Sequence, residues 1–400
     1  MTVKTYLSTV GYPLVILLVL HFLNPFDLGF IFAYLLVVFC ALIKKKQLIR
    51  DLDLDFLLLL CFGACYSIFD ALNGHSTFQY MVMRAIFPAF FYILGKQLIV
   101  KGLTTKHIIL VVLALVVLFS TTTILSIGKD LLKGGFAQIS RTIPDFWTGQ
   151  GIKATKYSSY LVYAMGLPAV LISISKLYHR KTIWALTAFF FVALLCVFRL
   201  GSRTAISIAV ITFLFGLGTL FMQQNAKDNI RLIAFLGLFT FLMLKFSPLN
   251  LESEVFSTLG HRLQAKGTSS NESAGGRTEL WASAIENMGK NPLGWKSKRH
   301  AHNLWLDIAK FAGIIPVIFL VLFNIRNFNN HLRLIRLDRT RYPNGIKIMF
   351  SLFTLGAVTS FFVEPIFQGN LFAFTFFCLL QGTLSAFLER SSTNNHNKEP

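Results

Sequence analysis

Long apolar runs recur along the whole chain, and they restrict its fold more than any other feature. Each run has roughly 17–25 residues, the length that an α-helix needs to cross the ~30 Å hydrocarbon core of a bilayer. Backbone polar groups have no water to bind inside a bilayer, so a spanning segment has to satisfy them within a helix or a closed barrel. Only 14% of the 400 residues are charged, against about 25% in soluble proteins. The sequence therefore predicts an all-α, polytopic integral membrane protein.

Twelve transmembrane helices are expected, in a single domain that covers residues 1–400. Residues 391–400 are polar and are expected to form a disordered cytoplasmic tail. The predicted helix ranges are 6–23, 28–43, 55–72, 79–99, 107–127, 157–175, 182–199, 204–222, 231–246, 303–325, 347–363 and 370–388.

The largest predicted loop covers residues 247–302, between the ninth and tenth helices. Within it, residues 278–288 place their apolar side chains on one helical face, and Gly289 is a natural stop. We expect a short helix here that lies on the outer membrane interface, with Trp281 at headgroup depth.

Basic residues set the expected orientation of the helices. The formal net charge is +20, and much of it lies in short loops after the second, fourth, sixth and tenth predicted helices. These loops fall on one side of the twelve-helix arrangement, which the positive-inside rule makes cytoplasmic, together with both termini. The charge therefore does not indicate nucleic acid. Two longer loops on the other side, 128–156 and 247–302, are also basic. They are either solvated loops or a surface that holds an anionic ligand.

The cysteines and the helix pattern give no sign of other common functions. All five cysteines lie in apolar runs, which favours packing over a disulfide framework or a zinc site. No pair of interrupted helices recurs in two halves of the chain, as secondary transporters often have. The cysteines are Cys40, Cys61, Cys65, Cys196 and Cys378.

Three arginines in or beside predicted helices are candidate site residues. Arg199 and Arg203 flank a tight turn on the external side, where an arginine either anchors the helix end or binds a ligand. Arg84 lies in the middle of the fourth predicted helix, where it either pairs with a carboxylate such as Asp70 or binds ligand.

A fourth arginine, Arg277, follows Gly275 and Gly276 at the predicted start of the short loop helix. Free N–H groups and the helix dipole favour an anion at such a position. The guanidinium group adds a bidentate fork that fits phosphate.

Two histidines stand at the entry to the tenth predicted helix, in the segment His300-Ala-His302-Asn303. A histidine can accept a proton near neutral pH, although a loop histidine often has no special role. No cysteine or acidic cluster accompanies this pair, so no metal site is expected. Asp307 and Lys310 follow on the helix and are expected to pair.

The predicted topology brings Arg203, Arg277 and His302 to one face of the membrane. Two arginines would neutralise a leaving diphosphate. A histidine would take the proton from an attacking hydroxyl group. The three residues thus suit a transfer reaction on a diphosphate.

These residues, in this order, resemble the O-antigen ligase and O-antigen polymerase superfamily of bacterial envelope glycosyltransferases. The ligases carry His, then Asn, Ser or Gln, nine residues, Gly, two residues, then Gly, Thr or Tyr. Here His302-Asn303 is followed by nine residues and Gly313, while Pro316 stands at the last position of the pattern. This spacing and the neighbouring Asn303 are the reasons for preferring His302 over His300.

The resemblance implies inverting, metal-independent and cofactor-free transfer of a glycan from undecaprenyl diphosphate to lipid A–core, at the periplasmic face of the bacterial inner membrane. His302 would be the base, and Arg203 and Arg277 would hold the diphosphate. Arg199, His300, Asn303 and Arg84 would support them. The alternative within the superfamily is a polymerase that joins repeat units on the carrier. The alternative of another class is a flippase or transporter for the same lipid, which would line a path with charged residues inside its helices.

Overall fold

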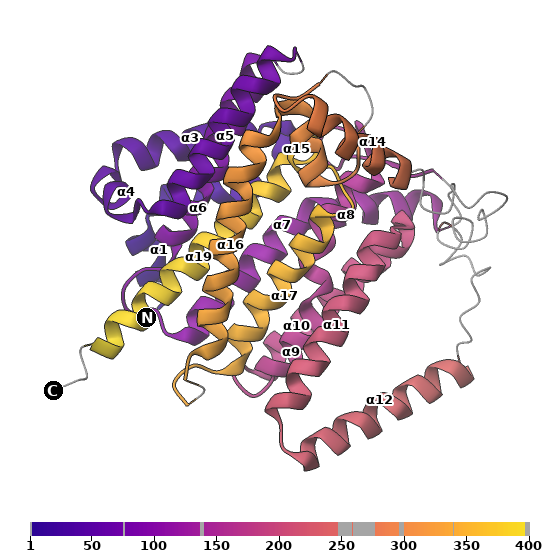
Figure 1. Ribbon diagram of the computed structural model, residues 1–400. Coiled ribbons are helices and arrows are strands. Elements are labelled where there is room, and N and C mark those ends of the chain that lie inside the picture. Colours follow the sequence, from indigo (N-terminus) through magenta and orange to yellow (C-terminus); the bar gives the residue numbers. More distant parts are fainter. Residues whose placement is uncertain are drawn as a thin grey trace.

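The computed structural model describes residues 2–74, 77–136, 140–246, 258, 277–295, 300–338 and 340–396. In these ranges the chain is almost wholly helical (Figure 1). One two-stranded antiparallel sheet interrupts the helices, formed by β1 (Thr142–Pro144) and β2 (Gly151–Lys153). Eight of the described helices are long and apolar enough to cross a membrane, or nine spans if the bent pair at the N-terminus counts as one. The all-α, membrane-embedded class is thereby confirmed.

The eight helices correspond to eight of the twelve predicted spans. One of them is a helix pair, α8 and α9, that continues across Gly166 as a single span. The bounds are α5 Leu54–Leu72, α6 Phe78–Leu98, α7 Thr105–Gly134, α8 Ala154–Met165, α9 Leu167–Ile174, α10 Arg180–Leu200, α11 Arg203–Gln223, α17 Asn344–Phe361 and α19 Leu371–His396.

The remaining described helices are shorter, bent or more polar. The predicted short helix in the large loop is present as α14. These helices are α1 Val3–Val10, α2 Tyr12–Leu23, the 3-10 turn η1 Pro25–Asp27, α3 Gly29–Leu42, α4 Lys45–Asp51, α12 Ala226–Phe246, α14 Arg277–Lys290, α15 Leu304–Ala312, α16 Ile314–Arg336 and α18 Ile366–Gly369.

Two predicted helices are divided at a glycine, and in this respect the prediction was wrong. The first expected span, 6–23, is α1 and α2, which meet at an angle of 89°. Gly11 lies between them with φ +101°, a conformation that other residues rarely adopt. The tenth expected span, 303–325, is α15 and α16, divided at Gly313 with φ +80°.

Two further predicted spans are not among the eight. The second, 28–43, corresponds to α3, which has 14 residues and is too short to cross a ~30 Å core alone. The ninth, 231–246, lies in α12, which carries Lys227, Asp228 and Arg231 in its first turns. Figure 1 shows α12 at the lower right, running crosswise to α11 and away from the bundle.

Helix α19 forms the centre of the bundle, where other helices cover its whole apolar length. It crosses α6 with the two backbones in contact. A Cβ at Gly95 would lie 1.9 Å from the Leu379 carbonyl oxygen, and one at Gly382 would lie 1.8 Å from that of Tyr92. Small residues at such crossings allow membrane helices to pack closely. The helix continues to His396, so residues 391–396 of the predicted tail are helical, and 397–400 lie outside the described residues.

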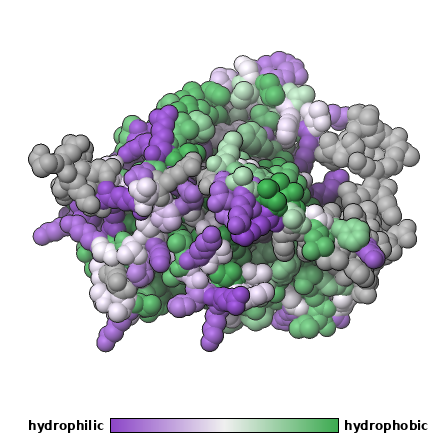
Figure 2. Space-filling model, turned by 90° about the horizontal axis from the view of Figure 1, so that it is seen from below, coloured by the Kyte–Doolittle hydropathy of each residue, from purple (hydrophilic) through white to green (hydrophobic). Residues whose placement is uncertain are grey.

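The two ends of the bundle differ in what they carry. Helix α1 lies on the left in Figure 1 and α19 runs towards the lower left, whereas α14 and α15 lie at the top. Seen from below, hydrophilic side chains gather over the middle of the lower end, with hydrophobic side chains around them (Figure 2). At this end Lys96 Nζ lies 2.8 Å from Asp53 Oδ2 and 2.7 Å from Glu389 Oε1, which ties α6 to α5 and α19. The candidate site residues of the loops gather at the opposite end.

Candidate functional site

The turn between α10 and α11 fixes the position of Arg203. Gly201 ends α10 in the left-handed conformation, with φ +54°. The Ser202 side chain then accepts a hydrogen bond from Ala205 N at 3.3 Å and caps α11. Arg203 is therefore the first residue of α11, and its side chain is half-buried.

Arg199 is an internal anchor of this turn. Its side chain is fully buried, with Nη2 2.7 Å from Asp130 Oδ2 at the end of α7. Its Nη1 donates to the Ser140 carbonyl oxygen at 3.1 Å. A buried pair of this kind fixes two segments against each other and leaves the guanidinium group no contact with a ligand. Of the two alternatives for Arg199, the structure favours the anchor.

Arg84 forms the ion pair with Asp70 that the sequence suggested. Nη1 of Arg84 lies 2.9 Å from Asp70 Oδ2, and the two side chains are 11% and 1% exposed. The guanidinium carbon also lies 5.5 Å from the centre of the Tyr66 ring, within the range of a cation–π contact. Arg84 therefore ties α6 to α5 and neutralises a buried carboxylate.

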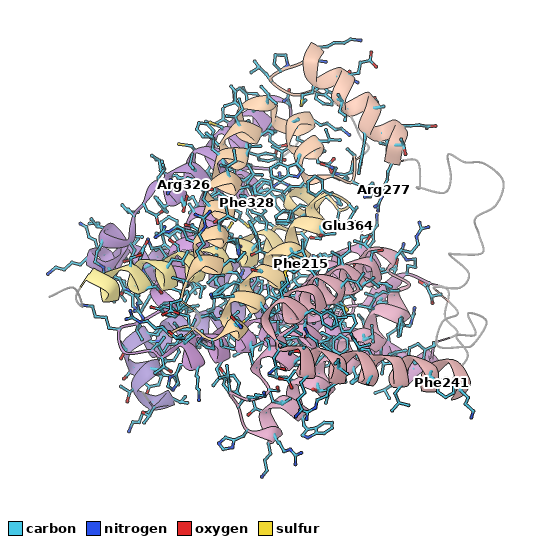
Figure 3. The ribbon with its side chains drawn as sticks, turned by 60° about the horizontal axis from the view of Figure 1, so that its bottom comes forward. Phe215, Phe241, Arg277, Arg326, Phe328 and Glu364 are labelled. Carbon is cyan, nitrogen blue, oxygen red and sulfur yellow. The ribbon has the colours of Figure 1, made fainter. Side chains whose placement is uncertain are left out.

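Arg277 opens α14, as predicted, and faces a buried glutamate. Its Nη2 lies 3.7 Å from Oε1 of Glu364, and the two side chains are 29% and 6% exposed (Figure 3). The Thr204 hydroxyl donates to the same Glu364 oxygen at 3.2 Å. Glu364 thus connects the start of α14 with the start of α11, next to Arg203. Gly275 and Gly276, the other members of this motif, lie outside the described residues.

Sequence reasoning missed Glu364. The signal was a single carboxylate placed directly after the apolar run of α17. An acid at such a position needs a cation or hydrogen-bond donors, and the external arginines were the available cations.

His302 lies in a short loop that one carboxylate holds in shape. The residue has φ +54°, a backbone conformation that is costly for a non-glycine residue. Asp307 Oδ1 accepts a hydrogen bond from Ala301 N at 2.6 Å, and Oδ2 accepts one from Asn303 N at 3.3 Å. Both peptide N–H groups on either side of His302 therefore bind one buried side chain. The expected ion pair of Asp307 with Lys310 is not formed among the described residues.

Helix α14 supports the same loop from the other side. The Trp281 indole Nε1 donates to the Ala301 carbonyl oxygen at 2.7 Å. Trp281 was predicted at headgroup depth, and its polar end is bound to the protein itself. The contact holds α14, and with it Arg277, against the loop of His302.

Asn303 and Gly313 mark the two ends of α15. The Asn303 side chain accepts hydrogen bonds from Trp305 N and Leu306 N and thereby caps the helix. Gly313 ends the helix with φ +80°, and a Cβ there would lie 2.3 Å from the Pro292 carbonyl oxygen. The nine residues between Asn303 and Gly313 in the sequence pattern are the nine residues of α15. Both residues therefore have a structural role that positions His302 at the end of this helix.

The surroundings of His302 lower its pKa. Burial is the main cause, the positive charge of Arg277 and the neighbouring His300 add to it, and Asp307 opposes it. Its Nδ1 is buried without a hydrogen-bond partner among the described residues. The neighbouring His300 has its Nδ1 3.8 Å from Asp307 Oδ1. His302 is thus a neutral imidazole at neutral pH, as a proton acceptor has to be.

The structure brings five of the seven candidate residues to one place. Arg277 and His302 lie within electrostatic range of each other, His300 and Asn303 flank His302 in its loop, and Arg203 lies beside the Thr204–Glu364 contact. Arg199 and Arg84 are engaged in buried ion pairs. Among the described residues no group of three His, Cys, Asp or Glu side chains is arranged to hold a metal ion.

A scan against protein-family models found no match for this chain, and neither did a search of curated proteins.

Proposed function

We propose that this protein is a glycosyltransferase of the O-antigen ligase type, which moves a glycan from undecaprenyl diphosphate to lipid A–core. One connected set of contacts carries the proposal. Arg277 lowers the pKa of His302, lies 3.7 Å from Glu364, and through Glu364 is joined to the residue that follows Arg203. A proton acceptor and two guanidinium groups thereby lie at one end of a membrane bundle.

The proposed reaction is a single displacement at the anomeric carbon. The acceptor hydroxyl oxygen forms a bond to this carbon, and the bond from the carbon to the diphosphate oxygen breaks. The electron pair of the broken bond stays on the diphosphate, and the hydroxyl proton moves to His302. Attack opposite to the leaving group inverts the configuration of the sugar. The leaving diphosphate gains negative charge, which Arg277 and Arg203 stabilise.

The membrane setting agrees with a lipid-linked donor. The diphosphate of such a lipid lies at headgroup height, and the proposed residues lie at a bundle end beside spans such as α11 and α17. We propose that this end faces the periplasm and that the end with both termini faces the cytoplasm, in the bacterial inner membrane.

Ligase and polymerase share this donor and this base, and they differ in the acceptor. The spacing of His302, Asn303 and Gly313, with α15 between them, favours the ligase. The lipopolysaccharide profile separates the two activities.

A transporter is the candidate of another class, and the buried charges of the bundle disfavour it. Transport requires charged or polar side chains that line a path through the helices. Arg84 is paired with Asp70, and Arg199 with Asp130, so these charges stabilise helix contacts.

The test is the lipopolysaccharide profile of a strain that lacks the protein, complemented with wild type or with His302→Ala. If the protein is a ligase, core lipopolysaccharide of the deletion strain loses all O-antigen while long glycan accumulates on the carrier. Complementation with His302→Ala should leave this defect in place. Core with a single repeat unit would identify a polymerase instead. His179→Ala is the matched control. His179 is exposed and precedes α10, at the end of that helix opposite to the turn before Arg203, and its side chain makes no capping hydrogen bond. A normal ladder with His302→Ala would contradict the assignment of the base.

A further inference from the structure

A further arginine lies at the same end of the bundle, in the segment before β1. Arg141 Nε donates to the carbonyl oxygen of Leu200 at 3.3 Å. Leu200 is the last residue of α10. Its own carbonyl oxygen accepts a hydrogen bond from Ala154 N at 2.8 Å, at the start of α8. Arg141 is thereby fixed beside the turn from which Arg203 extends.

Among the described residues, the charged side chains that act on Arg141 are Glu364 and Arg203. The pKa of Arg141 is lowered mainly by burial; Glu364 attracts its charge, and Arg203 repels it. Glu364 is also the carboxylate that lies 3.7 Å from Arg277 and accepts the hydrogen bond of Thr204. Glu364 therefore lies close to Arg277 and within electrostatic range of Arg141, which is itself within electrostatic range of Arg203. The three arginines come from three separate segments of the chain.

Within the part of the chain that the structure describes, this group of side chains carries more positive than negative charge. Three guanidinium groups and one carboxylate together carry a net charge of two positive units. Like charges held together at a half-buried site repel each other, and an anion between them removes that repulsion. A diphosphate joined to a lipid at one end and to a sugar at the other carries one negative charge on each phosphate. Its charge equals the excess at this site.

We infer that Arg141 is a third diphosphate-binding arginine, and that Glu364 adjusts the charge of the site to that of a diphosphate diester. The inference rests on the proposed function for the class of ligand. It adds one binding residue and one residue that sets selectivity. Glu364 also orders the site before the ligand arrives, because it holds Arg277 and Thr204 to the same oxygen.

The charge match has a consequence after transfer. The product is a diphosphate monoester, which has one more ionisable oxygen than the donor. With Glu364 in place the site is matched to the donor, and the extra charge of the product is left unbalanced. Removing the negative charge of Glu364 should shift preference towards the monoester.

Binding to the purified protein in detergent tests the inference without any transfer reaction. The diester probe is a short-chain isoprenyl diphosphate N-acetylglucosamine, and the monoester probe is farnesyl diphosphate, each measured by calorimetry. Arg141→Gln should weaken diester binding about ten- to hundredfold, the usual loss of a charge-assisted hydrogen bond. Glu364→Gln should increase the ratio of monoester to diester affinity.

Lys153→Gln is the matched control, since Lys153 is an exposed basic residue at the end of β2 in the same loop. It should change diester affinity less than about twofold. Thermal unfolding of each variant verifies that the fold is kept. Arg141→Lys retains the charge without the planar fork, so it should bind the diester with an affinity between those of wild type and Arg141→Gln. If Lys153→Gln and Arg141→Gln lowered the diester affinity equally, the inference would be overturned, because the diester would then bind to a diffuse basic surface. Wild-type affinity in Arg141→Gln would also overturn it, while leaving the role of His302 untouched. A wild-type protein that binds neither probe would contradict the proposed donor as well.

Discussion

Asp307→Asn tests how the loop of His302 is held. The carboxamide has the same shape, so its oxygen can still accept the short hydrogen bond from Ala301 N, which measures 2.6 Å. The NH₂ group then faces the Asn303 N–H, which loses its acceptor at 3.3 Å. A buried N–H without a partner costs about 1–3 kcal/mol, which is comparable to the cost of about 1–3 kcal/mol for the left-handed conformation of His302. We therefore expect the loop to be held less firmly in its functional shape.

The rate and its pH dependence should both change. A loss of about 1.4 kcal/mol in the reacting arrangement lowers kcat about tenfold. The negative charge of Asp307 raises the pKa of His302, so its removal lowers that pKa further. The acid limb of the pH–rate profile should then move to lower pH, because a more acidic solution is needed to protonate His302.

The assay is glycan transfer by purified protein over a range of pH, with Asp338→Asn as the control. Asp338 is an exposed carboxylate in the connection between α16 and α17, so its removal changes the net charge equally and leaves the loop untouched. An unchanged rate and profile in Asp307→Asn would refute the reasoning. A shift of the acid limb to higher pH would also refute it, because that direction means that the loop has opened to water.

Three further predictions follow from the same contacts. Arg277→Lys should lower transfer at least tenfold, since an ammonium group cannot form the planar fork on a diphosphate; near-normal activity would remove the bidentate role. Gly313→Ala should lower the thermal unfolding midpoint and the activity together, because φ is +80° and the new Cβ would lie 2.3 Å from the Pro292 carbonyl oxygen; a wild-type midpoint would show that the turn adapts. Wild-type transfer should decline with acidification only below about pH 6.5, the ordinary pKa of histidine, since burial and Arg277 lower the pKa of His302; an acid limb above that value would contradict the assignment.

The membrane class and most spans could be predicted because hydrophobic length is a local property of the sequence. The interruptions of these spans at glycine residues could not be predicted. A glycine inside an apolar run is common at helix crossings, as at Gly95 and Gly382, and the sequence does not distinguish these from Gly11 and Gly313, where the chain turns. Only the three-dimensional neighbours decide whether a glycine continues a helix or ends it.

The pairing of buried charges was predictable in one case and not in the other. Arg84 and Asp70 both lie within apolar runs of adjacent helices, so each is the obvious partner of the other. Asp130 lies near the end of the long helix α7, and nothing in the sequence relates it to Arg199, which is 69 residues away. The anchor role of Arg199 therefore needed the structure.

The roles of the two acidic residues of the site depend on contacts that are not local in the sequence. Asp307 was expected to pair with Lys310 by its spacing on a helix, but the turn before α15 offers backbone N–H groups that are closer. Glu364 is an isolated carboxylate in its segment, and its role depends on three arginines from other segments of the chain.

Reconstitution of the protein with labelled undecaprenyl-diphosphate glycan and lipid A–core acceptor tests the central claim most directly. We predict that wild type releases undecaprenyl diphosphate and forms the glycosylated acceptor in equal amounts, and that His302→Ala forms neither while it inserts and folds normally. Movement of intact donor across the bilayer without a new glycosidic bond would contradict the account, and so would product formation by His302→Ala at the wild-type rate.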